Sequence, residues 1–219
     1  RVEQWRRTGE RPAVAVWTAA QTAQFLTSIE RHRLYAAYHL IALRGLRRGE
    51  AAGLRWCDLD LDGKTAVISQ QLQQYDGRLA VCPPKTAHST RTIALDHTTV
   101  AALAAHRERQ LAEAAAFGPG YRPSGFVFTN LNGDPMAPDR LTRIFKKLAA
   151  EAGLPPVRLH DLRHGAATLL QVSRITSGAS FGRSRGHALP AAQRAALRRA
   201  RSGDGPPGMR DLRCHRLAA

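Results

Sequence analysis

Residues 58–95 read DLDLDGKTAVISQQLQQYDGRLAVCPPKTAHSTRTIAL, and the residue pattern that determines the fold class changes within this stretch. Runs rich in β-branched residues are separated by an Asp-Gly pair and by a Pro-Pro-Lys-Thr segment, and both are turn signals. The pattern predicts three short antiparallel strands, at about 65–72, 78–82 and 90–95. Lys85 should then lie in the turn between the second and third strands.

Helical patterns precede this stretch. Thr18 is a candidate N-cap with Gln21 as its capping-box partner, and a helix with Phe25 on its apolar face should follow. The apolar residues 34–43 predict a second, buried helix that ends at Gly45. The segment RRGEAAGL predicts a short third helix.

Helical spacing returns after the strands. Residues 98–116 predict a helix with Val100, Leu103 and Leu111 facing inward, and FVFTN adds a short apolar segment. A further helix should follow APD and end at Gly153. Its apolar residues at helical spacing are Leu141, Ile144, Phe145 and Leu148. The segment LHDLRHGAATLL also has helical spacing, so the predicted fold is mainly α with a small three-stranded antiparallel sheet.

Composition narrows the class of protein. The 219 residues contain 33 Lys and Arg against 17 Asp and Glu, a formal net charge of +16, which is typical of a protein with a polyanionic partner. Nucleic acid is favoured over an anionic membrane, because no apolar run is long enough to span a bilayer and no signal peptide is recognisable. A cytoplasmic protein is expected. The three cysteines show no CxxC spacing, so neither a disulfide framework nor a metal site is indicated.

Four basic residues form a candidate site for phosphate chemistry. Arg47 begins a predicted helix, Lys85 lies in a predicted turn, and His160 precedes Arg163 by one helical turn. Two guanidiniums can donate paired N–H groups to one phosphate, a lysine can protonate a leaving oxygen, and a histidine can exchange a proton with the attacking group. Each residue alone is also what a solvated surface charge would look like, so their order and context carry the hypothesis.

Three segments together resemble the tyrosine recombinase family, the phage-type integrases. They are ALRGLRRGEAAGLRWCDLDLD, PPKTAHSTRTIAL and LHDLRHGAATLL, and the resemblance covers residues from about 15 to 170. It implies the tyrosine-recombinase catalytic-domain fold, with Arg47 and Arg163 as the two catalytic arginines and Glu50 supporting the first. Lys85 matches the hairpin lysine of the family, and His160 matches its first motif histidine.

The resemblance also implies a reaction. Family members cut double-stranded DNA by attack of a tyrosine hydroxyl on the scissile phosphate, which forms a 3′-phosphotyrosine and frees a 5′-hydroxyl. This chemistry needs no metal and no nucleotide cofactor. The implied partners are double-stranded DNA and other recombinase protomers, and no membrane is involved.

The family pattern breaks after Arg163. Family members continue with a helix, an LGH motif and then the nucleophilic tyrosine, whereas the four tyrosines here all precede His160. The sequence RGH places His187 24 residues past Arg163, without the expected apolar helix around it. His187 is therefore either a chance Gly-His pair or a degenerate form of the family motif.

This break suggests a division of the chain. Residues 1–14 are expected to be a linker remnant of an upstream core-binding domain, and residues 15–170 an incomplete tyrosine recombinase catalytic domain. Residues 171–219 hold ten Arg and two Asp with few apolar anchors, so we expect a disordered tail or a gene segment read in the wrong frame.

Three functional interpretations remain open from the sequence. The first is a site-specific DNA recombinase that is inactive unless another protomer supplies the tyrosine. The second is a non-catalytic DNA-binding remnant that still grips backbone phosphates. The third is an unstable product that lacks the last helices of its core.

Overall fold

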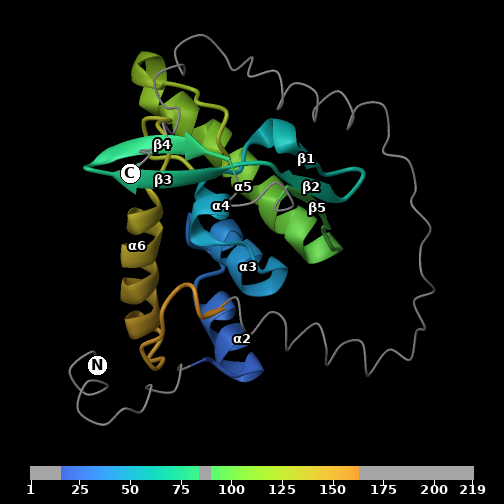
Figure 1. Cartoon of the computed structure of the whole chain (residues 1–219), viewed down its shortest axis with the longest axis vertical. Helices are drawn as coiled ribbons and strands as arrows, with labels where there is room; N and C mark the ends of the chain where they lie inside the picture. The colour runs from blue at the N-terminus through green and yellow to red at the C-terminus, as the bar shows by residue number, and fades with distance from the viewer. Residues whose placement is uncertain (1–15, 84–89, 163–219) are drawn as a thin grey trace, which may run out of the picture.

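The computed structural model describes residues 16–83 and 90–162. The fold is mainly helical, as predicted (Figure 1). Its α-helices are α2 (Ala19–Ser28), α3 (Tyr35–Arg44), α4 (Arg48–Ala52), α5 (His97–Phe117) and α6 (Pro138–Glu151), with 3-10 turns η1 (Trp56–Asp58) and η3 (Gly118–Gly120). Its strands are β1 (Leu59–Asp60), β2 (Thr65–Ile68), β3 (Gln71–Tyr75), β4 (Arg78–Cys82) and β5 (Arg91–Ala94). The expected linker and tail, residues 1–14 and 171–219, lie outside the described residues.

The strands form two antiparallel sheets, which corrects the predicted single sheet. One has three strands in the order β1-β2-β5, and the other is the hairpin β3-β4. The predicted strand 65–72 is two strands in the structure: β2 ends at Ile68, and β3 begins at Gln71. Ile68 and Leu72 are both buried, and they lie an even number of positions apart. Side chains alternate between the two faces of a strand, so the two residues fit the pattern of one continuous strand, and the sequence shows no sign of the break.

Capping residues begin and end the helices where the sequence indicates. The Thr18 hydroxyl accepts from the Gln21 backbone N–H at 3.2 Å, and the Gln21 side chain accepts from the Thr18 N–H at 2.9 Å. Gly45 ends α3 with a φ of 67°, and Gly153 follows α6 with a φ of 68°. Glycine reaches this left-handed region without the steric penalty of a side chain.

An aromatic cluster joins α2, α3 and α6. The ring of Phe145 lies 5.3 Å from Phe25, 5.5 Å from Trp17 and 5.9 Å from Tyr38 between ring centroids. The Tyr38 hydroxyl donates to the Leu141 carbonyl at 2.9 Å, so its polar end is satisfied inside the core. These contacts hold α6 against the two earlier helices.

The inward face of α5 differs from the prediction. Leu103 is buried and Val100 partly so, but Leu111 is 58% exposed, which contradicts its predicted place. His106 and Gln110 are buried instead, because they bind the irregular segment 126–129, whose backbone needs partners.

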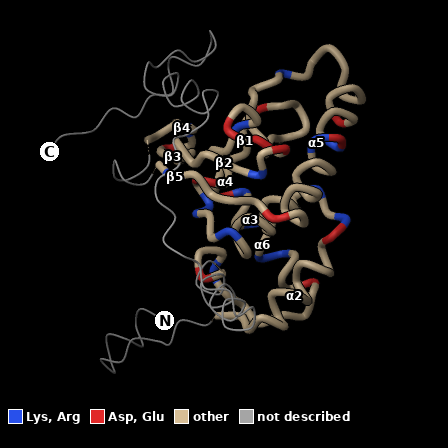
Figure 2. Tube along the Cα trace, turned by 90° about the vertical axis from the view of Figure 1, so that its right-hand side faces the viewer, with Lys and Arg blue, Asp and Glu red and all other residues tan. Residues whose placement is uncertain are grey.

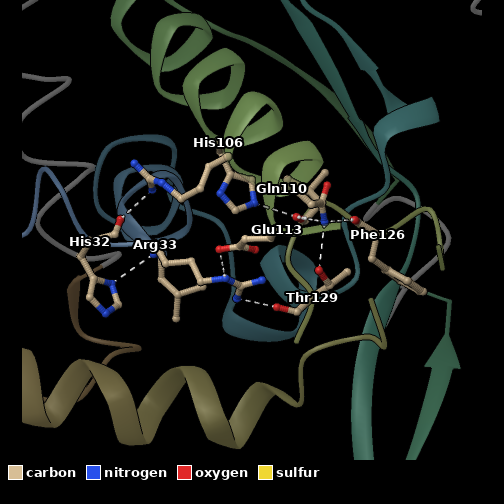
Figure 3. Close-up of polar contacts among 10 residues, drawn as sticks. His32, Arg33, His106, Gln110, Glu113, Phe126 and Thr129 are labelled. Carbon is tan, nitrogen blue, oxygen red and sulfur yellow. Dashed lines mark hydrogen bonds and ion pairs between the residues drawn. The ribbon is translucent and has the colours of Figure 1, made fainter. Parts of the chain in front are cut away.

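Gln110 Nε2 donates to the Phe126 and Val127 carbonyls, both at 3.2 Å, and to the Thr129 hydroxyl at 3.0 Å (Figure 3). His106 Nε2 binds the Val127 carbonyl at 2.8 Å. The same figure shows Arg33, from the loop before α3, which pairs with Glu113 of α5 at 2.7 Å. This polar network holds α5 to the segment 126–129 and to the loop before α3.

Two glycines let α4 lie directly on the backbone of β3. A Cβ atom at Gly53 would lie 2.9 Å from the Gln71 Cα, and one at Gly49 would lie 2.8 Å from the Leu72 carbonyl oxygen. Both separations are too short for carbon, so nothing larger than glycine fits at either position without a shift of the chain. The close approach therefore fixes α4 relative to the hairpin.

Gly53→Ala is expected to lower the free energy of unfolding by about 1–3 kcal/mol, because the added methyl group meets backbone that has no room to move. Urea denaturation followed by circular dichroism measures the change. Ala105→Ser, on the exposed side of α5, is the matched control and should cost about 0.5 kcal/mol. An unchanged midpoint for Gly53→Ala would show that α4 and β3 are not in close contact.

Candidate phosphate-binding site

The short helix α4 positions Arg47. This residue precedes the helix in an extended conformation, with φ −70° and ψ 152°. The carboxylate of Glu50 reaches back and accepts from the Arg47 backbone N–H at 2.8 Å and from its Nη1 at 2.7 Å. One acidic side chain in the first turn therefore fixes both the backbone and the guanidinium of Arg47, which supports the role that the family resemblance assigns to Glu50.

Arg91 binds the same carboxylate, although it was not among the site residues predicted from the sequence. Its Nη1 donates to Glu50 Oε1 at 3.0 Å and its Nη2 donates to Oε2 at 2.8 Å. The signal was present in the sequence, because Arg91 alternates with Thr92 in β5 and so shares a face with Ile93, which packs against the core. An arginine in phase with a core residue needs a buried acidic partner.

The electrostatics of Glu50 follow from these contacts. Its side chain is only 2% exposed, and burial alone would raise its pKa. The hydrogen bonds from Arg91 and from the backbone and side chain of Arg47 outweigh burial and lower the pKa to about 2. Glu50 is therefore ionised at every physiological pH.

A hollow of about 730 Å³ lies beside this carboxylate, among α4, β3, α6 and residues 158–160. In Figure 1 the hairpin crosses one end of α6, and α4 lies next to both. The hollow is lined by Arg47, Arg48, Gly49, Gln71, Leu72, Gln73, Gln74, Tyr75, Pro138, Asp139, Thr142, Lys146, Arg158, Leu159 and His160. Arg47 and His160, far apart in the sequence, thus face one space.

The other candidate residues have no described position. Lys85 lies within residues 84–89, and Arg163 and His187 lie beyond residue 162, so all three are outside the described part of the chain. The predicted helix over LHDLRHGAATLL is described only up to Leu162. The structure brings Arg47 and His160 together and leaves the placement of the other three as predictions.

The charged residues that line the hollow are mainly basic. Among the described residues, four cationic side chains, those of Arg47, Arg48, Lys146 and Arg158, line it together with one carboxylate, that of Asp139, which pairs with Arg48 at 2.7 Å. Elsewhere along the described elements, Lys and Arg are interspersed with Asp and Glu (Figure 2). An excess of positive charge in a concave surface favours anions, and guanidiniums match the oxygens of a phosphate.

Among the described residues, no group of three or more His, Cys, Asp or Glu side chains is arranged to hold a metal ion. None of the helices in residues 16–83 and 90–162 has the length and apolar character that a bilayer crossing requires.

The family model described as the Phage integrase family matches residues 16–176, most of the chain. The chain belongs to this family. Among curated integrases and recombinases, it is similar to "Tyrosine recombinase XerC-like" of Caldanaerobacter subterraneus subsp. tengcongensis, with 31% identity over 65% of this chain and 40% of the relative. It is 26% identical to the ICEBs1 integrase of Bacillus subtilis over 73% of this chain and 44% of that protein. The chain therefore spans less than half the length of these phage-integrase-family relatives.

Solved structures of the family share the fold. The Tn1549 transposon integrase in complex with transposon right end DNA superposes with a TM-score of 0.64 at 22% identity, over 91% of this chain and 70% of that one. The XerA recombinase superposes with a TM-score of 0.58 at 19% identity, over 87% of this chain and 67% of that one. These superpositions show the fold of the tyrosine recombinase catalytic domain, which confirms the predicted fold class.

Proposed function

We propose that this chain of the phage integrase family binds the backbone phosphates of double-stranded DNA in the hollow that Arg47 and His160 line. We also propose that it does not cut the DNA strand by itself. The observation that carries the proposal is the shared hollow, where a guanidinium held by Glu50 faces the same space as His160. Lys85 and Arg163 complete the site in this proposal, on the family resemblance alone.

The comparisons support a DNA partner. The Tn1549 transposon integrase, whose fold this chain shares, was solved in complex with transposon DNA. The sequence adds a formal net charge of +16, which favours a polyanion. A backbone phosphate is the DNA group that a cluster of arginines and a histidine is best suited to bind.

Strand cleavage should fail for lack of a nucleophile. All four tyrosines precede His160, whereas the family nucleophile follows the second arginine. Tyr38 is fully buried, its hydroxyl donates to a backbone carbonyl, and burial raises its pKa. Tyr75 lines the hollow from the end of β3, but Gln73 accepts a hydrogen bond from its hydroxyl.

Affinity for a mixed-sequence duplex should fall steeply with salt, and Arg47→Ala should flatten that dependence. Each lost phosphate contact lowers the slope of log K against log salt by about 0.9. Fluorescence anisotropy across a salt series measures both. Arg163→Ala should behave like Arg47→Ala, whereas Arg109→Ala is the control, because Arg109 lies on α5 and donates to the His32 carbonyl at 3.2 Å. Equal effects of Arg47→Ala and Arg109→Ala would mean that the hollow is not a phosphate site.

Incubation with nicked suicide duplexes should give no covalent protein–DNA adduct. A pool of randomised duplexes avoids the need to know the target site, and denaturing electrophoresis followed by peptide mass spectrometry detects any phosphotyrosine. Tyr75→Phe and Tyr121→Phe serve as controls. An adduct that maps to either tyrosine and disappears in the matching variant would show that the chain carries its own nucleophile.

A further inference from the structure

Two guanidiniums share one buried carboxylate beside the hollow. Glu50 Oε1 accepts from Nη1 of Arg47 at 2.7 Å and from Nη1 of Arg91 at 3.0 Å. Its Oε2 accepts from the Arg47 backbone N–H and from Nη2 of Arg91, both at 2.8 Å. Each oxygen thus has two donors, which uses the hydrogen-bonding capacity of the carboxylate.

The two arginines lie on different sides of that carboxylate. Arg47 lines the hollow and its side chain is 43% exposed, whereas Arg91 is not among the lining residues and is 31% exposed. Arg91 begins β5, which pairs with β2 in the three-stranded sheet. It therefore holds Glu50 from the sheet side through both terminal nitrogens, and Arg47 holds it from the side of the hollow.

The charges do not balance. One carboxylate faces two guanidiniums, so the trio carries a net positive charge. Because Arg91 binds Glu50 through two parallel bonds, the strongest geometry for such a pair, it neutralises most of the negative charge. Arg47 is then oriented by Glu50 without losing its attraction for an anion in the hollow.

We propose that Arg91 is a positioning residue, which locks the Glu50 carboxylate and offsets its charge so that the guanidinium of Arg47 remains available to a DNA phosphate. This inference rests on the proposed function, because Arg47 supplies the phosphate contact. Arg91 itself touches no DNA. Without it, Glu50 and Arg47 would form a neutral pair, and the hollow would lose affinity for phosphate although Arg47 is still present.

A double-mutant cycle in the full chain separates positioning from direct contact. Arg91→Gln and Arg47→Ala should each weaken binding to a mixed-sequence duplex by roughly tenfold, as expected for one charge-assisted contact. Arg91→Gln should have no further effect when Arg47 is already Ala. Effects that multiply would show that Arg91 contacts DNA independently, and the proposal would be wrong.

Removal of the negative charge provides a rescue that a purely structural role for Arg91 would not produce. Adding Glu50→Gln to Arg91→Gln should restore part of the lost affinity, because the amide no longer neutralises Arg47, although it positions Arg47 less firmly than the carboxylate does. Arg91→Lys keeps the positive charge but loses the paired donors, so it should bind DNA more tightly than Arg91→Gln and more weakly than the parent chain. No rescue, or an Arg91→Lys variant as weak as Arg91→Gln, would overturn the electrostatic part of the inference.

Controls separate the two proposals from misfolding and from each other. Thermal unfolding should show one cooperative transition for each variant used, and the Arg91→Lys variant keeps the test open if Arg91→Gln unfolds. Arg31→Ala, on the exposed loop before α3, reports the effect of losing one arbitrary charge. If Arg47→Ala weakens binding strongly and Arg91→Gln does not, only the role of Arg91 is wrong. If Arg47→Ala matches Arg31→Ala, the proposed function is wrong and this inference falls with it.

Discussion

Phe145→Ala is expected to lower the free energy of unfolding by about 3–5 kcal/mol. The side chain is fully buried on α6, and its ring lies within 6 Å, between centroids, of Trp17, Phe25 and Tyr38. Truncation removes one edge-to-face contact, with Phe25, and two tilted ring contacts, with Trp17 and Tyr38, and it leaves a cavity that rigid rings cannot fill. Urea denaturation, followed by far-ultraviolet circular dichroism, measures the loss.

Phe117→Ala is the matched control, because it removes the same atoms at the exposed end of α5. The Phe117 side chain is 46% exposed and meets only the ring of Tyr121 among the described aromatic residues, at 6.5 Å. Its loss should change stability by about 0.5 kcal/mol or less. Equal losses for the two variants would mean that the rings around Phe145 do not form the centre of the core.

Acidification should destabilise the protein by on the order of 3 kcal/mol through Glu50 alone. The folded pKa of Glu50 is about 2, below its ordinary value of 4.5, because the hydrogen bonds from Arg91 and Arg47 outweigh the effect of burial. A lowered carboxyl pKa contributes stability that is fully present above the ordinary value and is lost as the pH falls toward 2. Asp96, whose pKa is also lowered to about 2, adds a smaller contribution because its side chain is 47% exposed.

Denaturation midpoints measured between pH 7 and pH 2 report this loss. Glu50→Gln should be less stable than the parent chain at pH 7, and its stability should depend less steeply on pH below 4.5. Asp139→Asn is the control, because Asp139 is an exposed carboxylate that lines the hollow. Solvent screens its ion pair with Arg48, so its removal should change stability little. A Glu50→Gln variant with the same acid dependence as the parent would show that the ion pairs do not stabilise the fold.

Much of the fold could be predicted from local sequence signals. The capping box at Thr18, the left-handed glycine at position 45 and the apolar spacing around Phe145 each specify a helix within a few residues. The pairing of the strands into two sheets could not be predicted in the same way. Strand partners depend on contacts between distant segments, and the buried residues Ile68 and Leu72 keep the same parity across the break between two strands.

The site was predicted in part, for a similar reason. Arg47 was singled out by its motif, and the structure places it beside His160 on a common hollow. Arg91 was missed, because its importance comes from a carboxylate 41 positions away rather than from its neighbours in sequence. The apolar spacing predicted that Leu111 faces inward. In the structure Gln110 is buried and Leu111 is exposed, because the backbone of residues 126–129 needs the hydrogen bonds that Gln110 donates.

The glycine contact between α4 and β3 has a consequence for how the hairpin can vary. The base of the β3-β4 hairpin packs against α4 at Gln71 and Leu72. Its tip turns at Asp76 and Gly77, whose φ values of 47° and 78° are those of a two-residue hairpin turn. Pairs of residues inserted at the tip would extend the ribbon without disturbing its base. The reach of the hairpin over the hollow is thus a length that insertions can adjust, while Arg47 stays in place.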